Sequence, residues 1–246
     1  MYEFVTGPLA WISFGIFFIG LIYRLVWYIR GLNWQLDRVA YTHHVSYGIK
    51  GALRSVFFWM VPYGTTGWRK NPGFTFLVFI LHIGLLATPI FLKGHNILLM
   101  ERLGFSFWTL SESTADGLTA VVIAAIVFLI LRRIAKPEVR LMTDAGDYMM
   151  LLMAAAPFIT GILAHYQVGN YRFWLILHIL CGEILLIAIP FTKLSHFVLF
   201  FASRAQLGMD YGVSNNTGKP SGTDANALIS HAISKGFTWF DTDQAY

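Results

Sequence analysis

Four of the eight histidines lie within or at the ends of long apolar stretches, where their type and spacing suit metal ligation. They are His82, His95, His178 and His196. A polar side chain at membrane depth is a functional candidate by default. Haem iron held by two histidines needs one imidazole from each side of the porphyrin plane, so two neighbouring helices that each supply two histidines can hold two haems. The sequence therefore predicts two b-type haems with these histidines as axial ligands.

The spacing of the four histidines predicts how they pair. His178 and His196 are 18 residues apart, which places both on one face of a straight helix, about 27 Å apart. His82 and His95 are 13 residues apart, about 20 Å along a helix, but their directions differ by about 140°, and Pro89 between them can kink the helix and change its phase. Because the two helices are expected to be antiparallel, the first histidine of one faces the last of the other. The predicted pairs are His82 with His196 near the cytoplasm, and His95 with His178 near the outside.

Other polar residues in the same segments are weaker candidates. Lys93 and Gly94 directly precede His95, where the ammonium could hydrogen-bond a quinone carbonyl, although a lysine that snorkels to the membrane interface is the simpler interpretation. Glu183 could relay protons or bind a quinol hydroxyl, or equally be protonated and hydrogen-bonded to an adjacent helix. The quinone considered is menaquinone. His165 is a substitute for His95 as a ligand, with an interfacial histidine as the simpler alternative. For any one histidine alone, a hydrogen bond to a neighbouring helix is the alternative to ligation.

Membrane-spanning helices must position these residues. The chain is 56% apolar and 13% charged, whereas soluble domains carry roughly 25% charged residues. Each span needs about 20 apolar residues, and a helix satisfies its own backbone without water. Suitable segments lie at about residues 9–29, 74–91 with a continuation to 100, 118–131, 148–164, and 173–190 with a continuation to 201. The predicted fold is an all-α, polytopic membrane bundle of about five transmembrane helices.

The basic residues predict the orientation of this bundle. Residues 30–72 contain six Lys and Arg and residues 132–147 contain four, whereas the alternate connections hold two and one. By the positive-inside rule the two basic connections are cytoplasmic, so the N-terminus lies outside and the C-terminus in the cytoplasm. Because the basic residues flank apolar segments, the net charge of +5 indicates topology and not nucleic-acid binding.

Two domains follow from this pattern. Residues 1–204 form the predicted di-haem transmembrane bundle, which includes a cytoplasmic loop at 30–72 that mixes basic with aromatic residues and predicts an interfacial amphipathic helix. Residues 205–246 form a predicted cytoplasmic tail of polar and small residues. Cys181 is the only cysteine, which excludes an iron–sulfur cluster ligated by this chain alone. Iron–sulfur chemistry would belong to a partner.

Several motifs resemble a known family. Residues 190–196, Pro-Phe-Thr-Lys-Leu-Ser-His, resemble the Pro-Phe-Ser-Arg-Leu-Val-His of the gamma (cytochrome b) subunit of respiratory nitrate reductase, a five-helix, two-haem, quinol-reactive protein. Residues 81–84 and 94–95 carry the rest of this resemblance, although their spacing departs from the family by three residues. Residues 26–32 and 206–211 are more similar to the homologous subunits of the Hmc and Tmc transmembrane redox complexes of sulfate-reducing bacteria. The resemblance covers most of the chain.

The resemblance implies a cytochrome b subunit of a respiratory complex in the bacterial inner membrane. It would relay electrons between a periplasmic multihaem cytochrome c or a quinone and a cytoplasmic iron–sulfur subunit, together with other membrane subunits. Whether the chain is itself an enzyme, or only an electron-transfer subunit of an oxidoreductase, stays open. A proton or solute transporter is one alternative, which predicts no visible haem and inverted repeats. A haem-free membrane anchor is the other.

Overall fold

The computed structural model of the chain describes residues 2–32 and 45–211, together with Ser230 and Ser234. Within these residues all the regular elements are helical, which confirms the all-α prediction. Most of the predicted tail lies outside the described residues. The elements are α1 (Tyr2–Phe4), η1 (Val5–Leu9), α2 (Ala10–Gly31), α3 (Val45–Met60), α4 (Thr66–Lys70), α5 (Pro72–Phe91), α6 (Lys93–Leu103), α7 (Glu112–Ala135), α8 (Pro137–Leu141), α9 (Ala145–His165), α10 (Tyr171–Phe191), η2 (Lys193–Ser195) and α11 (His196–Tyr211).

Five helical stretches among the described residues are long and apolar enough to cross a membrane. They are Tyr2–Gly31, Pro72–Phe91, Glu112–Ala135, Ala145–His165 and Tyr171–Phe191. The shortest has 20 residues, which is about the length that the hydrocarbon core requires. Large apolar side chains such as Ile19, Phe76 and Leu152 are exposed on these helices, as lipid contact demands. The chain is therefore a multi-pass membrane protein, with the five predicted spans.

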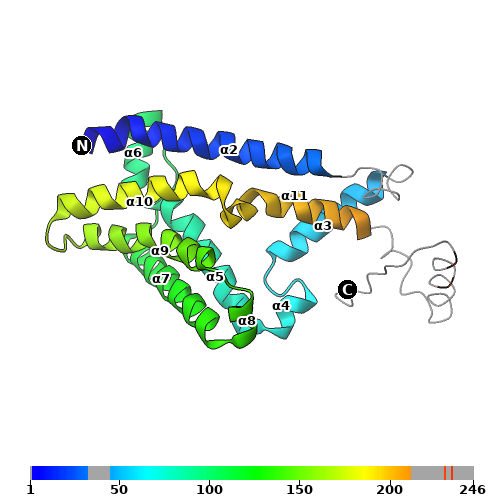
Figure 1. Cartoon of the computed structure of the whole chain (residues 1–246). Coiled ribbons are helices and arrows are strands. Elements are labelled where there is room, and N and C mark those ends of the chain that lie inside the picture. The colour runs from blue at the N-terminus through cyan, green and yellow to red at the C-terminus, as the bar shows by residue number, and fades with distance from the viewer. Residues whose placement is uncertain (1, 33–44, 212–229, 231–233, 235–246) are drawn as a thin grey trace. The chain divides into compact units, whose positions relative to one another are not determined.

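The chain divides into two compact units, and the histidines belong to the first, Met1–Arg24 with Gly73–Phe197. In this unit α7, α9 and α10 lie side by side (Figure 1). Its core is made of six small or aliphatic residues of α5, α7 and α9: Leu81, Val122, Ala125, Ile126, Ala154 and Ala155. A Cβ on Gly84 would lie 2.3 Å from Cγ2 of Val122, so the missing side chain lets α5 approach α7 closely, as small residues commonly do in membrane bundles.

The second predicted span does not continue as one helix to residue 100. It ends at Phe91, Leu92 adopts extended backbone angles (φ −67°, ψ 132°), and α6 starts at Lys93. The buried Asn96 stabilises this break: its amide nitrogen donates to the carbonyls of Ile90 (2.8 Å) and Leu92 (3.0 Å), and its Oδ1 accepts from the backbone N–H of Phe107 (2.7 Å). The Asn96 side chain therefore supplies a partner for the Ile90 carbonyl, whereas the Leu92 carbonyl also accepts from the backbone N–H of Asn96 (3.0 Å).

The fifth predicted span also ends before residue 201. Helix α10 stops at Phe191, and Thr192 is extended (φ −119°, ψ −177°). The Thr192 hydroxyl donates to the carbonyl of Ala188 (2.9 Å) and accepts from the N–H of Leu194 (3.2 Å). The chain then forms the short helix η2 before α11 begins at His196. The straight-helix geometry expected between His178 and His196 is therefore wrong, although both residues are helical.

The second unit contains Leu25–Pro72 and Val198–Tyr246. Its helix α3 carries exposed apolar residues at Ile49, Leu53, Phe57 and Met60, spaced along one face beside Lys50 and Arg54. This is the amphipathic helix expected in the 30–72 loop, of which residues 33–44 lie outside the described part. Helix α11 packs against α3, because the guanidinium of Arg204 lies 3.8 Å from the ring centre of Trp59. A Cβ on Gly208 would lie 2.4 Å from the carbonyl oxygen of Gly51.

Candidate functional site

The structure brings the four histidines together in the two pairs that the antiparallel arrangement of their segments predicted. The His82 pair consists of His82 on α5 and His196 at the start of α11, with ring centres 6.1 Å apart and ring planes at 83°. The His95 pair consists of His95 on α6 and His178 on α10, with ring centres 5.9 Å apart and planes at 14°. The two pairs are similar in separation but differ in the relative orientation of their rings.

The break at Leu92 explains how His95 joins the second pair. On a straight helix His95 would point about 140° away from His82. Because α6 is a new helix that begins at Lys93, its direction is independent of the phase of α5. The Nδ1–H of His95 donates to the carbonyl of Pro89 across this break (2.8 Å).

All four imidazoles use Nδ1 in the same way. The Nδ1 atoms of His82, His178 and His196 lie 2.7, 2.8 and 3.0 Å from the carbonyl oxygens of Val78, Pro157 and Lys193. A carbonyl oxygen only accepts, so Nδ1 carries a proton in each ring, and the Nε2 of the neutral ring has the lone pair that a metal would need. This is the arrangement by which histidines that bind metals are usually oriented.

The separation of the rings fits a metal ion between two Nε2 atoms. If each metal–nitrogen bond is about 2 Å, the two nitrogens lie about 4 Å apart and the ring centres about 6 Å apart, which matches both pairs. The described residues contain no group of three or more His, Cys, Asp and Glu side chains that could hold a bare ion. Two axial histidines suffice for haem, because its porphyrin supplies the remaining ligands of the iron. The residues present therefore fit haem.

The residues considered for a quinone site, Glu183 and Lys93 with Gly94, differ in their surroundings. Glu183 is buried in α10, with an exposed fraction of 6%, and neither carboxylate oxygen has a hydrogen-bond partner among the described residues. Lys93 and Gly94 are exposed at the first turn of α6. Within the described part of the chain, no hydrogen bond or ion pair joins Lys93 to Glu183. The hydrogen bond to an adjacent helix, one alternative for Glu183, is thus not found in that part.

His165 lies in a different group from the two pairs. Its Nε2 is 3.9 Å from Oδ1 of Asp116, and its ring contacts Tyr166, with centres 5.0 Å apart. The Tyr166 hydroxyl donates to Oδ2 of Asp116 (2.9 Å), and this hydrogen bond raises the pKa of Tyr166. The structure thus gives His165 an acidic and an aromatic neighbour at the end of α9, whereas His95 faces His178.

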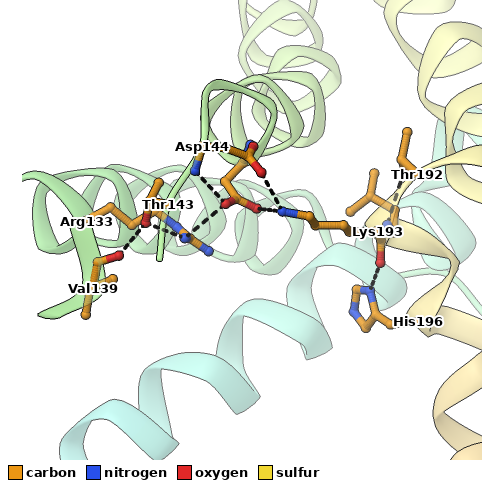
Figure 2. A network of polar contacts seen from close by, with 9 residues as sticks. Arg133, Val139, Thr143, Asp144, Thr192, Lys193 and His196 are labelled. Carbon is orange, nitrogen blue, oxygen red and sulfur yellow. Dashed lines mark hydrogen bonds and ion pairs between the residues drawn. The ribbon is translucent and has the colours of Figure 1, made fainter. Parts of the chain in front are cut away.

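A charged network adjoins the His82 pair. The Lys193 ammonium lies 2.9 Å from Oδ1 of Asp147 and 3.0 Å from Oδ2 of Asp144. These two hydrogen bonds raise the pKa of Lys193. The hydrogen bond from Lys193 lowers the pKa of Asp144, so both groups are ionised at neutral pH. Figure 2 shows this network together with His196, whose ring bonds to the Lys193 carbonyl.

Sequence reasoning missed several residues that orient the histidines. Asn96 fixes the break before α6. Gly161 leaves room for the His178 ring, because a Cβ there would lie 3.0 Å from it. Asp144 and Asp147 hold Lys193. The signal for the two aspartates was present: they flank the start of an apolar segment three residues apart, where they form reciprocal caps for α9. Asn96, a polar residue in an apolar setting, could also have been selected.

Comparisons with known proteins identify a relative. No protein-family model and no solved structure matches the chain. A protein of Nitratidesulfovibrio vulgaris (strain Hildenborough), described only as "Protein", is 53% identical over 213 residues, which cover 87% of this chain and 94% of that protein. Identity at this level over nearly the whole length of both chains shows common descent. The chain belongs to the same family as this Nitratidesulfovibrio vulgaris protein.

Proposed function

We propose that this protein is a di-haem cytochrome b subunit that relays electrons across the membrane. The observation that carries the proposal is the presence of two facing histidine pairs, each with ring centres about 6 Å apart and with every Nδ1 bonded to a backbone carbonyl. Histidines that merely joined neighbouring helices would have no reason to meet in two pairs in which every Nδ1 bonds to a backbone carbonyl and, within the described part of the chain, no Nε2 makes a hydrogen bond.

The chain's own residues prepare each site for iron. A hydrogen bond at Nδ1 fixes the tautomer, limits rotation of the ring and makes Nε2 more basic. His82 bonds to a carbonyl of its own helix, and His95 and His196 bond to carbonyls of the helix just before theirs. His178 instead bonds to Pro157 of α9. Bound haem would supply one-electron transfer, with a potential set by the axial ligands and their surroundings. The apolar helices exclude water from the spans.

The proposed orientation places the N-terminus outside and the C-terminus in the cytoplasm of a bacterial inner membrane. It is supported by the clustering of basic residues in the last turn of α7 and the segment that follows, which include Arg132, Arg133, Lys136 and Arg140. In this orientation the His82 pair is the cytoplasmic site and the His95 pair the periplasmic one. Electrons would pass between the two sides through both pairs.

The proposed partners come from the resemblance to the nitrate reductase gamma subunit and to the Hmc and Tmc membrane subunits. They are a cytoplasmic iron–sulfur subunit, a periplasmic multihaem cytochrome c and other membrane subunits. A quinone such as menaquinone is a further proposed partner. Glu183 supports it as a buried carboxylate without a described partner, and Lys93 as an ammonium two residues from His95.

A difference spectrum of the full-length chain, purified from membranes with its associated subunits, tests the proposal. The dithionite-reduced minus oxidised spectrum should be that of b-type haem, and pyridine haemochrome quantification should give about two haems per chain. His196→Ala and His178→Ala should each remove one haem, while His165→Ala should keep both. A fully assembled preparation without haem would overturn the proposal and leave a transporter or an anchor.

A further inference from the structure

The residue that aims His196 is itself held from a different helix. Lys193 lies in η2, between the end of α10 and the start of α11. Its backbone carbonyl accepts from Nδ1–H of His196 (3.0 Å). Its ammonium reaches the N-terminus of α9, where it bonds to Asp147 and Asp144 (Figure 2). One residue thus connects the imidazole ring with two carboxylates.

The two carboxylates are not free to move. The backbone N–H of Asp147 donates to Oδ1 of Asp144 (2.9 Å), and the N–H of Asp144 donates to Oδ2 of Asp147 (3.1 Å), which forms a capping box. Arg133 of α7 lies 3.9 Å from Asp147 and donates to the Thr143 hydroxyl (3.1 Å). The carboxylates therefore form a rigid anchor for the Lys193 ammonium.

The two anchoring bonds are not equivalent. The side chain of Asp147 has an exposed fraction of 9%, against 64% for Asp144. Water screens an exposed ion pair, so such a pair contributes little, whereas a buried charge depends on its partners. The bond to Asp147 should therefore dominate the anchor.

We propose that Lys193 is a positioning residue for His196, with Asp147 as its main anchor. This inference rests on the proposed haem function. Thr192 is extended and η2 has only three residues, so the backbone holds the Lys193 carbonyl only through a short turn, in which it accepts from the N–H of His196. The ammonium fixes it from the side-chain end. Without this anchor the turn would relax, and the His196 ring would lose its fixed plane.

The plane of the His196 ring has a spectroscopic consequence. The planes of the His82 pair are at 83° and those of the His95 pair at 14°. In oxidised low-spin haem, perpendicular axial rings leave two iron d orbitals close in energy, and parallel rings separate them. The electron paramagnetic resonance signal of the His82 pair should therefore show the larger g anisotropy. Rotation of His196 would reduce it.

The test compares Lys193→Met with Lys193→Arg in the complete, haem-loaded complex. Lys193→Met should shift the signal of the His82 pair toward smaller anisotropy and change its midpoint potential. It should also weaken haem retention at that site by about 10- to 100-fold, as loss of an orienting group does, measured by haem transfer to excess apomyoglobin. The signal of the His95 pair should not change. Lys193→Arg should restore the native signal, because a guanidinium can also bond to both carboxylates.

Matched variants separate positioning from charge. Lys136→Met removes the same charge from the connection after α7 and should leave both signals unchanged. Asp147→Asn should reproduce the effect of Lys193→Met, and Asp144→Asn should have a smaller effect, which keeps the inference testable even if Lys193→Met does not assemble. If the native protein has two low-spin signals but Lys193→Met and Asp147→Asn leave the His82 pair unchanged, the positioning role is refuted while the haem function stands. If the native protein has no low-spin haem, the proposed function itself fails.

Discussion

At the scale of single residues, the two sites depend on their surroundings to different degrees. His82 bonds to Val78, four residues earlier on its own helix. His178 bonds to Pro157, 21 residues away on α9. The ring of His178 is therefore oriented by a neighbouring helix, and the packing of α9 on α10 decides where its Nε2 points. A local change at the contact between Pro157 and His178 should therefore affect the His95 pair first.

Gly161 provides the test of this dependence. A Cβ at Gly161 would lie 3.0 Å from both Nδ1 and Cε1 of His178, which is closer than the normal contact distance. Gly161→Ala should therefore displace the ring and selectively lower the haem content of the His95 pair, as seen in the difference spectrum and in the low-spin signals. Gly117→Ala is the matched control, because a Cβ there meets nothing within 4 Å. Equal haem content in both variants would contradict the orienting role of α9.

At the scale of elements, the sequence was sufficient to predict the five spans but not the residues at which the second and fifth of them end. Length and apolarity alone determine a span, because the bilayer requires about 20 apolar residues and a helical backbone. The breaks at Leu92 and Thr192 follow from polar side chains whose partners lie elsewhere in the chain or in the next turn. The apolar length of a segment treats each helix alone, so it extended the fifth segment too far and left open whether the second continues to residue 100.

The candidate site, like the spans, could be predicted from the sequence only in part. The pairing of four histidines could be predicted, since antiparallel helices fix which histidines face each other. The angle of about 140° between His82 and His95 on an ideal helix could not be resolved from sequence, because Asn96 and the loop that contains Phe107 determine the direction of α6. Nor could the sequence show that the ring planes differ between the pairs.

Asn96 therefore carries a prediction about α6. Asn96→Leu removes three hydrogen bonds and leaves the Phe107 N–H and the Ile90 carbonyl without that partner, while the Leu92 carbonyl keeps the backbone N–H of residue 96; the loss should lower stability by about 1–3 kcal/mol. The thermal midpoint of the purified protein should fall. Haem should be lost first from the His95 pair, because His95 lies in the same turn of α6 as Asn96. The His82 pair is the internal control. Parallel loss of both haems, or of neither, would contradict this role.

At the scale of the whole molecule, charge and apolar surface describe how the protein meets the membrane. The spans expose large apolar side chains, and the basic residues are concentrated in alternate connections. Basic connections are translocated poorly, and anionic lipid of the cytoplasmic leaflet attracts them. Both effects keep such connections on the cytoplasmic side. The relative from Nitratidesulfovibrio vulgaris aligns over 94% of its length, so the same topology is expected of it.

Cysteine labelling of spheroplasts checks this topology. The only native cysteine is Cys181, so a Cys181→Ala background that retains its haem spectrum accepts single new cysteines. Ser106→Cys lies in the exposed connection after α6, and Met142→Cys lies after α8, where Met142 has an exposed fraction of 86%. A membrane-impermeant maleimide added to spheroplasts should label Ser106→Cys at once and Met142→Cys only after the membrane is opened, because the basic connection that contains Met142 is expected to stay in the cytoplasm. The reverse pattern would invert the orientation and move the His82 pair to the outer side, without changing how either pair is built.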